Sequence, residues 1–169
     1  MKWVTSIVLG FAALALQATL MPHLSIAGIR PDLPLVAVVL LGSARGGTTG
    51  TLAGFAIGLA QDLTNPGFLG LNALTKSLLG WGAGSLRSQF NAGSLPVHAV
   101  VLFVAVLAHD AVYWTIFTRL QLSDLLAGML TRSLPTALYT ALAGMWILAA
   151  LGSRLGRGAH IGRPSFARR

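Results

Sequence analysis

The chain has 169 residues, of which 54% are hydrophobic and 9% are charged, and its formal net charge is +8. Soluble domains carry about 25% charged residues, so this composition excludes an ordinary water-soluble globule. The chain contains no cysteine, which excludes disulfides and thiolate metal sites. A basic tail after an apolar run is typical of contact with anionic membrane lipids, so we expect no nucleic-acid partner. The basic residues of this tail are Arg154, Arg157, Arg163, Arg168 and Arg169.

The apolar runs predict an all-α, polytopic membrane helix bundle, because a helix crosses a bilayer with about 20 apolar residues. In chain order the first expected helices cover residues 3–22, 33–44, 47–63, 68–86 and 96–117. The run at 33–44 is short for a span. We therefore expect about six transmembrane helices, or five if this run does not cross.

The last apolar run, residues 122–151, is too long for one simple span and contains Arg132 and Pro135. Its first part has apolar residues on one helical face, which is typical of a helix lying in the membrane interface. This face consists of Leu122, Leu125, Leu126, Met129 and Leu130. We expect the last span at 134–151. Residues 1–152 then form one integral membrane six-helix domain, and 153–169 form a basic, flexible cytoplasmic tail.

Lys and Arg residues predict the orientation, because they accumulate in cytoplasmic segments. With both termini cytoplasmic, Lys2, Arg45 and Arg87 lie inside together with the tail arginines, and Arg30 and Arg119 lie outside. The chain is thus expected to be a multi-pass protein with both ends in the cytoplasm.

Glycine recurs at every fourth position in the third expected helix, at Gly46, Gly50, Gly54 and Gly58, and the next step is Asp62. Helices in lipid associate by close backbone packing, so a strip without side chains favours contact with another helix. The helix that packs against the glycine strip belongs either to the same chain or to a partner protein, and the pattern leaves both alternatives open.

Ionisable residues inside a membrane usually face a partner or a cavity, because their charge is costly in lipid. The candidate members of an intramembrane polar network are Asp62, Lys76, Asp110 and Arg132. We expect Lys76 to pair with Asp110, or with Asp62 by extending towards the surface. In the alternative interpretation, each charge simply reaches the lipid headgroups.

No residue pattern indicates catalysis. His109 and Asp110 are adjacent, and neighbours on a helix point about 100° apart, so we expect no dyad. The sequence has no His-Glu-x-x-His zinc motif and no nucleophile elbow. We therefore expect no enzyme, no catalytic residue, no metal and no cofactor.

Several motifs occur together in a fixed order. Arg30-Pro31-Asp32 opens the second expected span, and Gly54-x-x-x-Gly58-x-x-x-Asp62 closes the third. Gly70-Leu71-Asn72-Ala73-Leu74-x-Lys76 begins the fourth, Asp110 lies in the fifth, and Leu134-Pro135-Thr136-Ala137-Leu138-Tyr139-Thr140-Ala141-Leu142 begins the last. This ordered set resembles the MreD family, the rod shape-determining membrane proteins of bacteria, over nearly the whole chain.

The resemblance implies a non-enzymatic scaffold subunit of the cell-elongation machinery in the cytoplasmic membrane, which helps to organise peptidoglycan synthesis. It implies MreC as the direct partner, and MreB, RodA and penicillin-binding protein 2 through MreC. We expect the glycine face, with help from Ala137, Ala141 and Gly144, to receive the transmembrane span of MreC. Internal packing of these residues is the alternative.

The family's fold is also similar to the substrate-binding subunit of energy-coupling-factor vitamin transporters. The alternative function is therefore a substrate-binding membrane subunit of a vitamin transporter. Such a subunit needs an outward pocket with placed polar groups. The residues expected to line it are Asp62, Asn65, Asn72, Lys76, Asp110 and Tyr113.

Overall fold

The computed structural model describes residues 2–20, 25–26, 28–64, 66–86, 95–119 and 121–158, and these residues are all-α. Its helices are α1 (Lys2–Leu20), α2 (Leu33–Arg45), α3 (Gly47–Asp62), α4 (Leu71–Ser85), α5 (Leu95–Phe117), α6 (Leu122–Gly128) and α7 (Leu134–Gly158). The described residues contain no strand, only one isolated bridge between Ile26 and Ile29. The expected all-α class is therefore confirmed.

Local chemistry explains where the central helices begin. Asp32 caps α2 with its side chain, and Pro34 lies in the first turn of α2, where a missing N–H has no cost. Gly46 has φ 99° and alone separates α2 from α3. Gly70 has φ 96° and precedes α4. Only glycine adopts such backbone angles without strain, so these two positions fix the tight connections.

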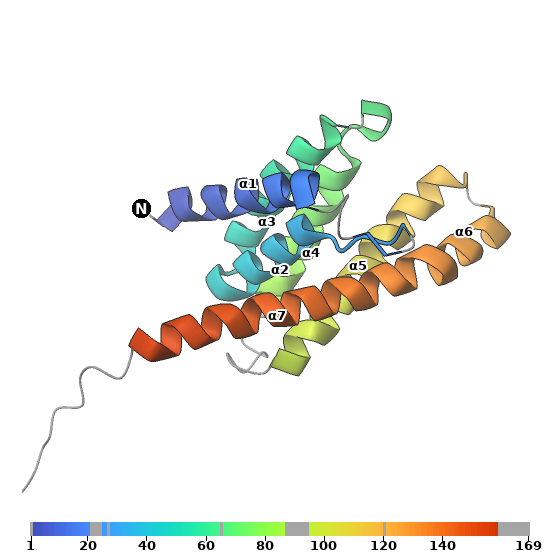
Figure 1. Ribbon diagram of the computed structural model, residues 1–169. Helices are drawn as coiled ribbons and strands as arrows, with labels where there is room; N and C mark the ends of the chain where they lie inside the picture. Colours follow the sequence, from blue (N-terminus) through green and yellow to red (C-terminus); the bar gives the residue numbers. More distant parts are fainter. Residues whose placement is uncertain are drawn as a thin grey trace, which may run out of the picture.

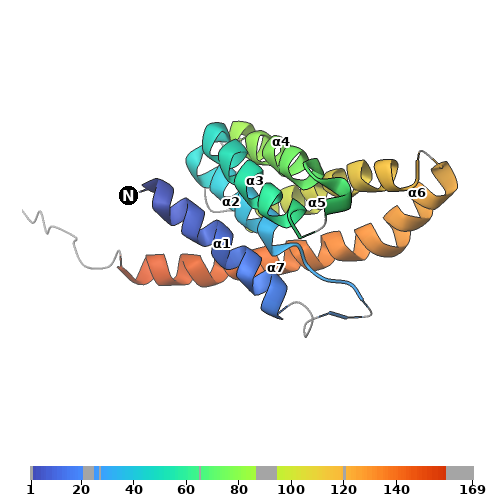
Figure 2. The ribbon, with the colours of Figure 1, turned by 90° about the horizontal axis from the view of Figure 1, so that it is seen from above.

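The helices form two units that lie side by side. Figure 1 and Figure 2 show α2, α3 and α4 packed together with α1 beside them, and α7 running along α5. The end where α5 meets α6 extends beyond α2, α3 and α4 in both views. The hydrophobic core lies between the two units. It includes Leu35, Val36 and Val39 of α2, Leu102 and Val106 of α5, and Ala137 and Ala141 of α7.

Two of the described helical segments, Leu95–Phe117 and Leu122–Ala150, are long and apolar enough to cross a membrane, and Leu33–Arg45 is a shorter apolar helix. The remaining expected spans form helices as well, but α3 and α4 have only 16 and 15 residues. At 1.5 Å per residue these two helices are about 24 and 22 Å long.

The expectation of a separate interfacial helix before residue 134 was wrong. α6 continues through a π-helical segment, Met129–Ser133, directly into α7, so that 122–150 form one continuous helix. Pro135 does not break it, because the wider π turn lies immediately before the proline and relieves the clash between its ring and the preceding turn. Leu125 and Met129 are half-buried, whereas Leu122, Leu126 and Leu130 are exposed.

The boundary predicted at residue 152 between a membrane domain and a flexible tail stays a prediction. The helix α7 continues to Gly158. Residues 159–169, which hold most of the predicted tail, lie outside the described residues.

Candidate functional site

A buried polar network has Lys76 at its centre. The Lys76 side chain is fully buried, and its Nζ donates to Oδ2 of Asp32 at 2.7 Å. Asp32 caps α2, since its Oδ1 accepts from the backbone N–H of Leu35 at 2.9 Å. The backbone N–H of Asp32 donates to Oγ1 of Thr140 at 3.0 Å. Asp32 therefore connects the start of α2 with both α4 and α7.

Asp62, the last residue of α3, binds the N-terminus of α4. Its carboxylate accepts the backbone N–H groups of Gly70, Asn72 and Ala73 at 3.0, 3.1 and 3.0 Å. The same carboxylate accepts from Nδ2 of Asn72 at 3.0 Å, and Asp62 is fully buried. A helix N-terminus carries free N–H groups and a partial positive charge, so it stabilises this anion without a nearby cation.

The helix α5 joins the network through His109. Its Nε2 lies 3.0 Å from Oδ1 of Asn72 and 3.5 Å from Nζ of Lys76. Its Nδ1 lies 3.1 Å from Oδ1 of Asp110. The network thus connects five helices, α2, α3, α4, α5 and α7, and it holds the two helix units together at one end of the bundle.

Two expectations about these residues were wrong. Lys76 binds Asp32, not Asp110 or Asp62, because Asp62 is already satisfied by α4 and Asp110 contacts His109. His109 and Asp110 do meet, although their Cα–Cβ bonds diverge. Nδ1 lies close to the point where the ring is attached, so a neighbouring carboxylate reaches it by rotation about its own side-chain bonds.

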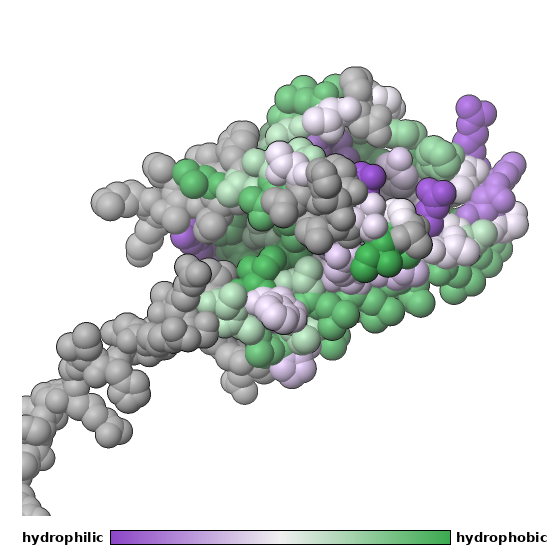
Figure 3. Space-filling model, viewed as in Figure 1, coloured by the Kyte–Doolittle hydropathy of each residue, from purple (hydrophilic) through white to green (hydrophobic). Residues whose placement is uncertain are grey.

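Sequence reasoning missed part of the network. It placed Asp32 and Asn72 only in motifs, it assigned His109 no role, and it gave Thr140 no contact. The available signal for Asp32 was its position before Leu33-Pro34, which is typical of a helix cap. Arg132, by contrast, is exposed on the π segment. Figure 3 shows hydrophilic side chains gathered at that end of the molecule.

The glycine strip of α3 packs against α4 of the same chain. A Cβ atom at Gly50 would overlap the carbonyl oxygen of Gly80, and one at Gly54 would overlap that of Lys76. At Gly58 it would overlap the carbonyl oxygen of Asn72. The strip therefore brings the α4 backbone close to α3, and this packing positions both Lys76 and Asn72. Internal packing, one of the two alternatives, accounts for these three glycines.

The other residues expected at a partner interface also face the inside. Ala137 is fully buried and Ala141 is 7% exposed, both in the core. A Cβ atom at Gly144 would overlap the Leu102 side chain of α5. Gly46 has open space around its Cβ position and instead makes the turn between α2 and α3. A partner helix that used these buried positions would have to displace part of the chain's own fold.

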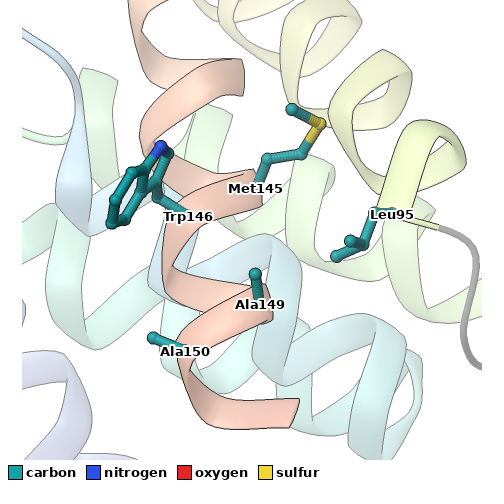
Figure 4. A pocket seen from close by; sticks show the side chains of 5 residues that line it. All are labelled: Leu95, Met145, Trp146, Ala149 and Ala150. Atoms are coloured by element: carbon teal, nitrogen blue, oxygen red, sulfur yellow. The ribbon is translucent and has the colours of Figure 1, made fainter. Parts of the chain in front are cut away.

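An apolar groove of about 420 Å³ crosses α7 near the start of α5. It is lined by Leu95, Met145, Trp146, Ala149 and Ala150. Figure 4 shows Met145 and Ala149 on the side of α7 that faces Leu95, with Trp146 on the other side. Trp146 is 80% exposed. Ala149 and Ala150, which have small side chains, are exposed as well.

The outward pocket expected for a transporter subunit receives no support from this arrangement. Asp62, Asn72 and Lys76 are bonded to one another or to neighbouring helices rather than turned towards an open space. Asn65 lies outside the described residues. Among the described residues, no group of three or more His, Cys, Asp or Glu side chains is arranged to hold a metal ion.

Comparison with known proteins supplies the family. The model of the family described as rod shape-determining protein MreD matches residues 1–150. No curated protein and no solved structure was found to match the chain, and the similarity to energy-coupling-factor subunits is unsupported. The matched family is one of membrane proteins that act in shape determination, and it is not a known enzyme family. Since the match covers most of its length, the chain belongs to the MreD family of rod shape-determining proteins.

Proposed function

We propose that this chain is a non-enzymatic scaffold subunit of the bacterial cell-elongation machinery, which crosses the cytoplasmic membrane several times and helps to organise peptidoglycan synthesis. Family membership supports the role in rod shape. The main structural support is that charged side chains lie inside the bundle and large apolar side chains lie outside, the reverse of a water-soluble protein. Lys76 and Asp62 are fully buried, whereas Trp146, Leu142 and Trp81 are 80%, 56% and 58% exposed. Apolar side chains outside and charges inside suit a protein surrounded by lipid.

The shorter helices belong to the proposed membrane domain as well. α2, α3 and α4 pack beside one another and carry exposed apolar residues such as Leu52, Phe55 and Leu78. A helix shorter than the hydrocarbon layer is accommodated by local thinning of the bilayer at modest cost. The charge pattern supports cytoplasmic termini, since Arg45 ends α2 at the opposite end of that helix from the Asp32 cap.

The contacts of the buried polar side chains support a scaffold rather than an enzyme. The network connects helices of the same chain and thereby fixes the shape of the bundle. We infer that such a bundle acts through contact with other membrane proteins. In the family these partners are MreC and, through MreC, the MreB filament, RodA and penicillin-binding protein 2.

The proposed contact of MreC is the apolar groove across α7, because the glycine strip is occupied by α4. Helices in lipid approach one another where side chains are small, and Ala149 and Ala150 offer such a place between Trp146 and Leu95. An exposed tryptophan beside small residues is typical of an anchor that dominates the energy of an interface. The side chains of one transmembrane helix of MreC would fill the groove.

Co-purification tests this contact. In mild detergent, Trp146→Ala and Ala150→Leu should each reduce the recovery of MreC about tenfold, which corresponds to a loss of 1.4 kcal/mol. Trp81→Ala is the matched control, because Trp81 is also exposed but lies on α4. It should leave the recovery of MreC unchanged. Cells in which only the α7 variants are expressed should become wider and rounder. Normal MreC recovery with both α7 variants would contradict the proposed contact.

A further inference from the structure

The helices on the two sides of the bundle differ in length. α3 and α4 have 16 and 15 residues and are about 24 and 22 Å long. α5 and the continuous helix Leu122–Ala150 have 23 and 29 residues and are about 35 and 44 Å long. The hydrocarbon layer of a typical bilayer is about 30 Å thick. From this difference we propose that the chain forms a step in bilayer thickness, in which the outer face of α3 and α4 binds lipids with short acyl chains. This inference rests on the proposed function, because it requires a chain that crosses the membrane.

The outer face of α3 and α4 is suited to contact with acyl chains. It consists of Leu52 and Phe55 on α3 and of Leu74, Leu78 and Trp81 on α4, which are all between 52 and 61% exposed. On their other sides the two helices pack against each other through the glycine strip, and both pack on α2. In a membrane, large apolar side chains that the chain itself leaves uncovered face the lipid.

Polar groups limit the height of this face at both ends. At one end, Asp62 is the last residue of α3, and its carboxylate binds the N–H groups at the start of α4. At the other end, Gly46 gives α3 no side-chain cap, and the exposed Ser85 ends α4. Free backbone groups at helix ends have to reach water or lipid headgroups. The two membrane surfaces must therefore approach each other to within about 24 Å on this face.

The exposed face of α7 is longer. Leu134, Leu138, Leu142 and Trp146 lie at every fourth position and are between 40 and 80% exposed. No charged residue occurs between Arg132 and Arg154, and a helix over 133–153 rises about 32 Å. This height matches an ordinary hydrocarbon layer. The two faces of the bundle thus differ in height by about 8 Å.

The packing of the bundle preserves this difference. α3 and α4 run obliquely to α7 in Figure 1 and Figure 2, so their height along α7 is less than their length. Asp32 bonds to Thr140 of α7 and to Lys76 of α4, and these contacts oppose a rotation of the short helices into line with α7. A helix that is shorter than the hydrocarbon layer thins the bilayer beside it, at a cost that grows with the mismatch. Lipids with short acyl chains avoid this cost, so they should accumulate beside α3 and α4.

Quenching of tryptophan fluorescence by brominated lipids tests the step. Trp81 on α4 and Trp146 on α7 are both exposed and report on the two faces. One protein keeps Trp81, with Phe at the other three tryptophan positions of the chain, and its matched control keeps Trp146 in the same way. Both are placed in vesicles that contain equal amounts of phosphatidylcholine with fourteen-carbon and with twenty-carbon chains. Either the short or the long lipid carries the bromine.

The quenching of each tryptophan is divided by its quenching in vesicles of that brominated lipid alone. Trp81 should then be quenched about twofold more by the short lipid than by the long one, because mismatch costs fractions of a kcal/mol per Å. Trp146 should show no preference for the short lipid. If both tryptophans are quenched with the same preference, the step is overturned, while the proposed membrane scaffold stands. If neither is quenched, the chain does not cross the membrane, and both proposals fail.

A second pair of variants keeps the internal contacts of the bundle. Trp114 donates to Ser133, so its replacement can disturb the end of α5. Trp81→Phe and Trp146→Phe are therefore also measured alone, and the quenched fluorescence that each substitution removes is assigned to the lost tryptophan. The component lost in Trp81→Phe should prefer the short lipid, and the component lost in Trp146→Phe should not. Equal preferences of the two components would overturn the proposal.

Discussion

At the scale of residues, Asp32 and Asp62 differ in the groups that donate hydrogen bonds to their carboxylates. The Asp62 carboxylate accepts three backbone hydrogen bonds at the N-terminus of α4 and needs no cation. Asp32 uses Oδ1 to cap α2, and its Oδ2 accepts from Lys76. Sequence alone predicted an intramembrane polar network of Asp62, Lys76, Asp110 and Arg132, because charge inside an apolar run is costly, although Arg132 is exposed. It could not identify the partner of Lys76, since Asp32 is distant in sequence and helix contacts are not encoded locally.

The ion pair leads to a prediction about stability. Lys76→Met should lower the free energy of unfolding by about 3–5 kcal/mol, because the Asp32 carboxylate loses its cation inside the bundle. Asp32→Asn in the same chain removes the charge but keeps a good helix cap. The double variant should therefore be more stable than Lys76→Met alone. Denaturant unfolding in detergent measures both. If Lys76→Met stays within about 0.5 kcal/mol of the original chain, the pair does not hold the bundle together.

At the scale of elements, apolar runs bounded by glycine, proline and charged residues predicted most helices within a few residues. α4 begins at Leu71 instead of Phe68, because Pro66–Phe68 form a separate 3₁₀ turn. The continuity of 122–150 was missed, because a π segment before Pro135 has no clear sequence signal. The glycine spacing indicated close helix packing, but it contained no information about whether α4 or a partner would fill the strip.

Gly54 on α3 and Gly82 on α4 differ in the space at their Cβ positions, and substitutions at the two sites should therefore have opposite effects. Gly54→Leu should destabilise the isolated protein by more than about 3 kcal/mol, since the new side chain would collide with the α4 backbone. Gly82 has open space at its Cβ position. Gly82→Ala should therefore stabilise α4 by up to about 1 kcal/mol through its higher helix propensity. Thermal unfolding of both variants in detergent gives the comparison. A Gly54→Leu protein that folds normally but no longer recovers MreC would place the partner on the strip instead.

At the scale of the whole molecule, the polar network and the glycine strip serve the same purpose. Both hold helices of one chain together, and they leave an apolar exterior with few charges. On the face that Figure 3 shows, exposed hydrophilic side chains gather at the end where α5 meets α6, whereas Arg45 ends α2. This distribution supports a bundle that crosses the membrane with these two ends on opposite sides. Composition alone made the membrane location predictable, but not the arrangement of the two helix units.

Labelling of single cysteines tests this central claim most directly, because the chain has no cysteine of its own. Ser123 in α6 and Ala44 near the end of α2 are both exposed and can each be replaced by cysteine. A membrane-impermeant maleimide should label Ser123→Cys in intact cells with a permeable outer envelope, and it should label Ala44→Cys only after the cytoplasmic membrane is opened. Labelling of both cysteines from the same side of that membrane would contradict the account.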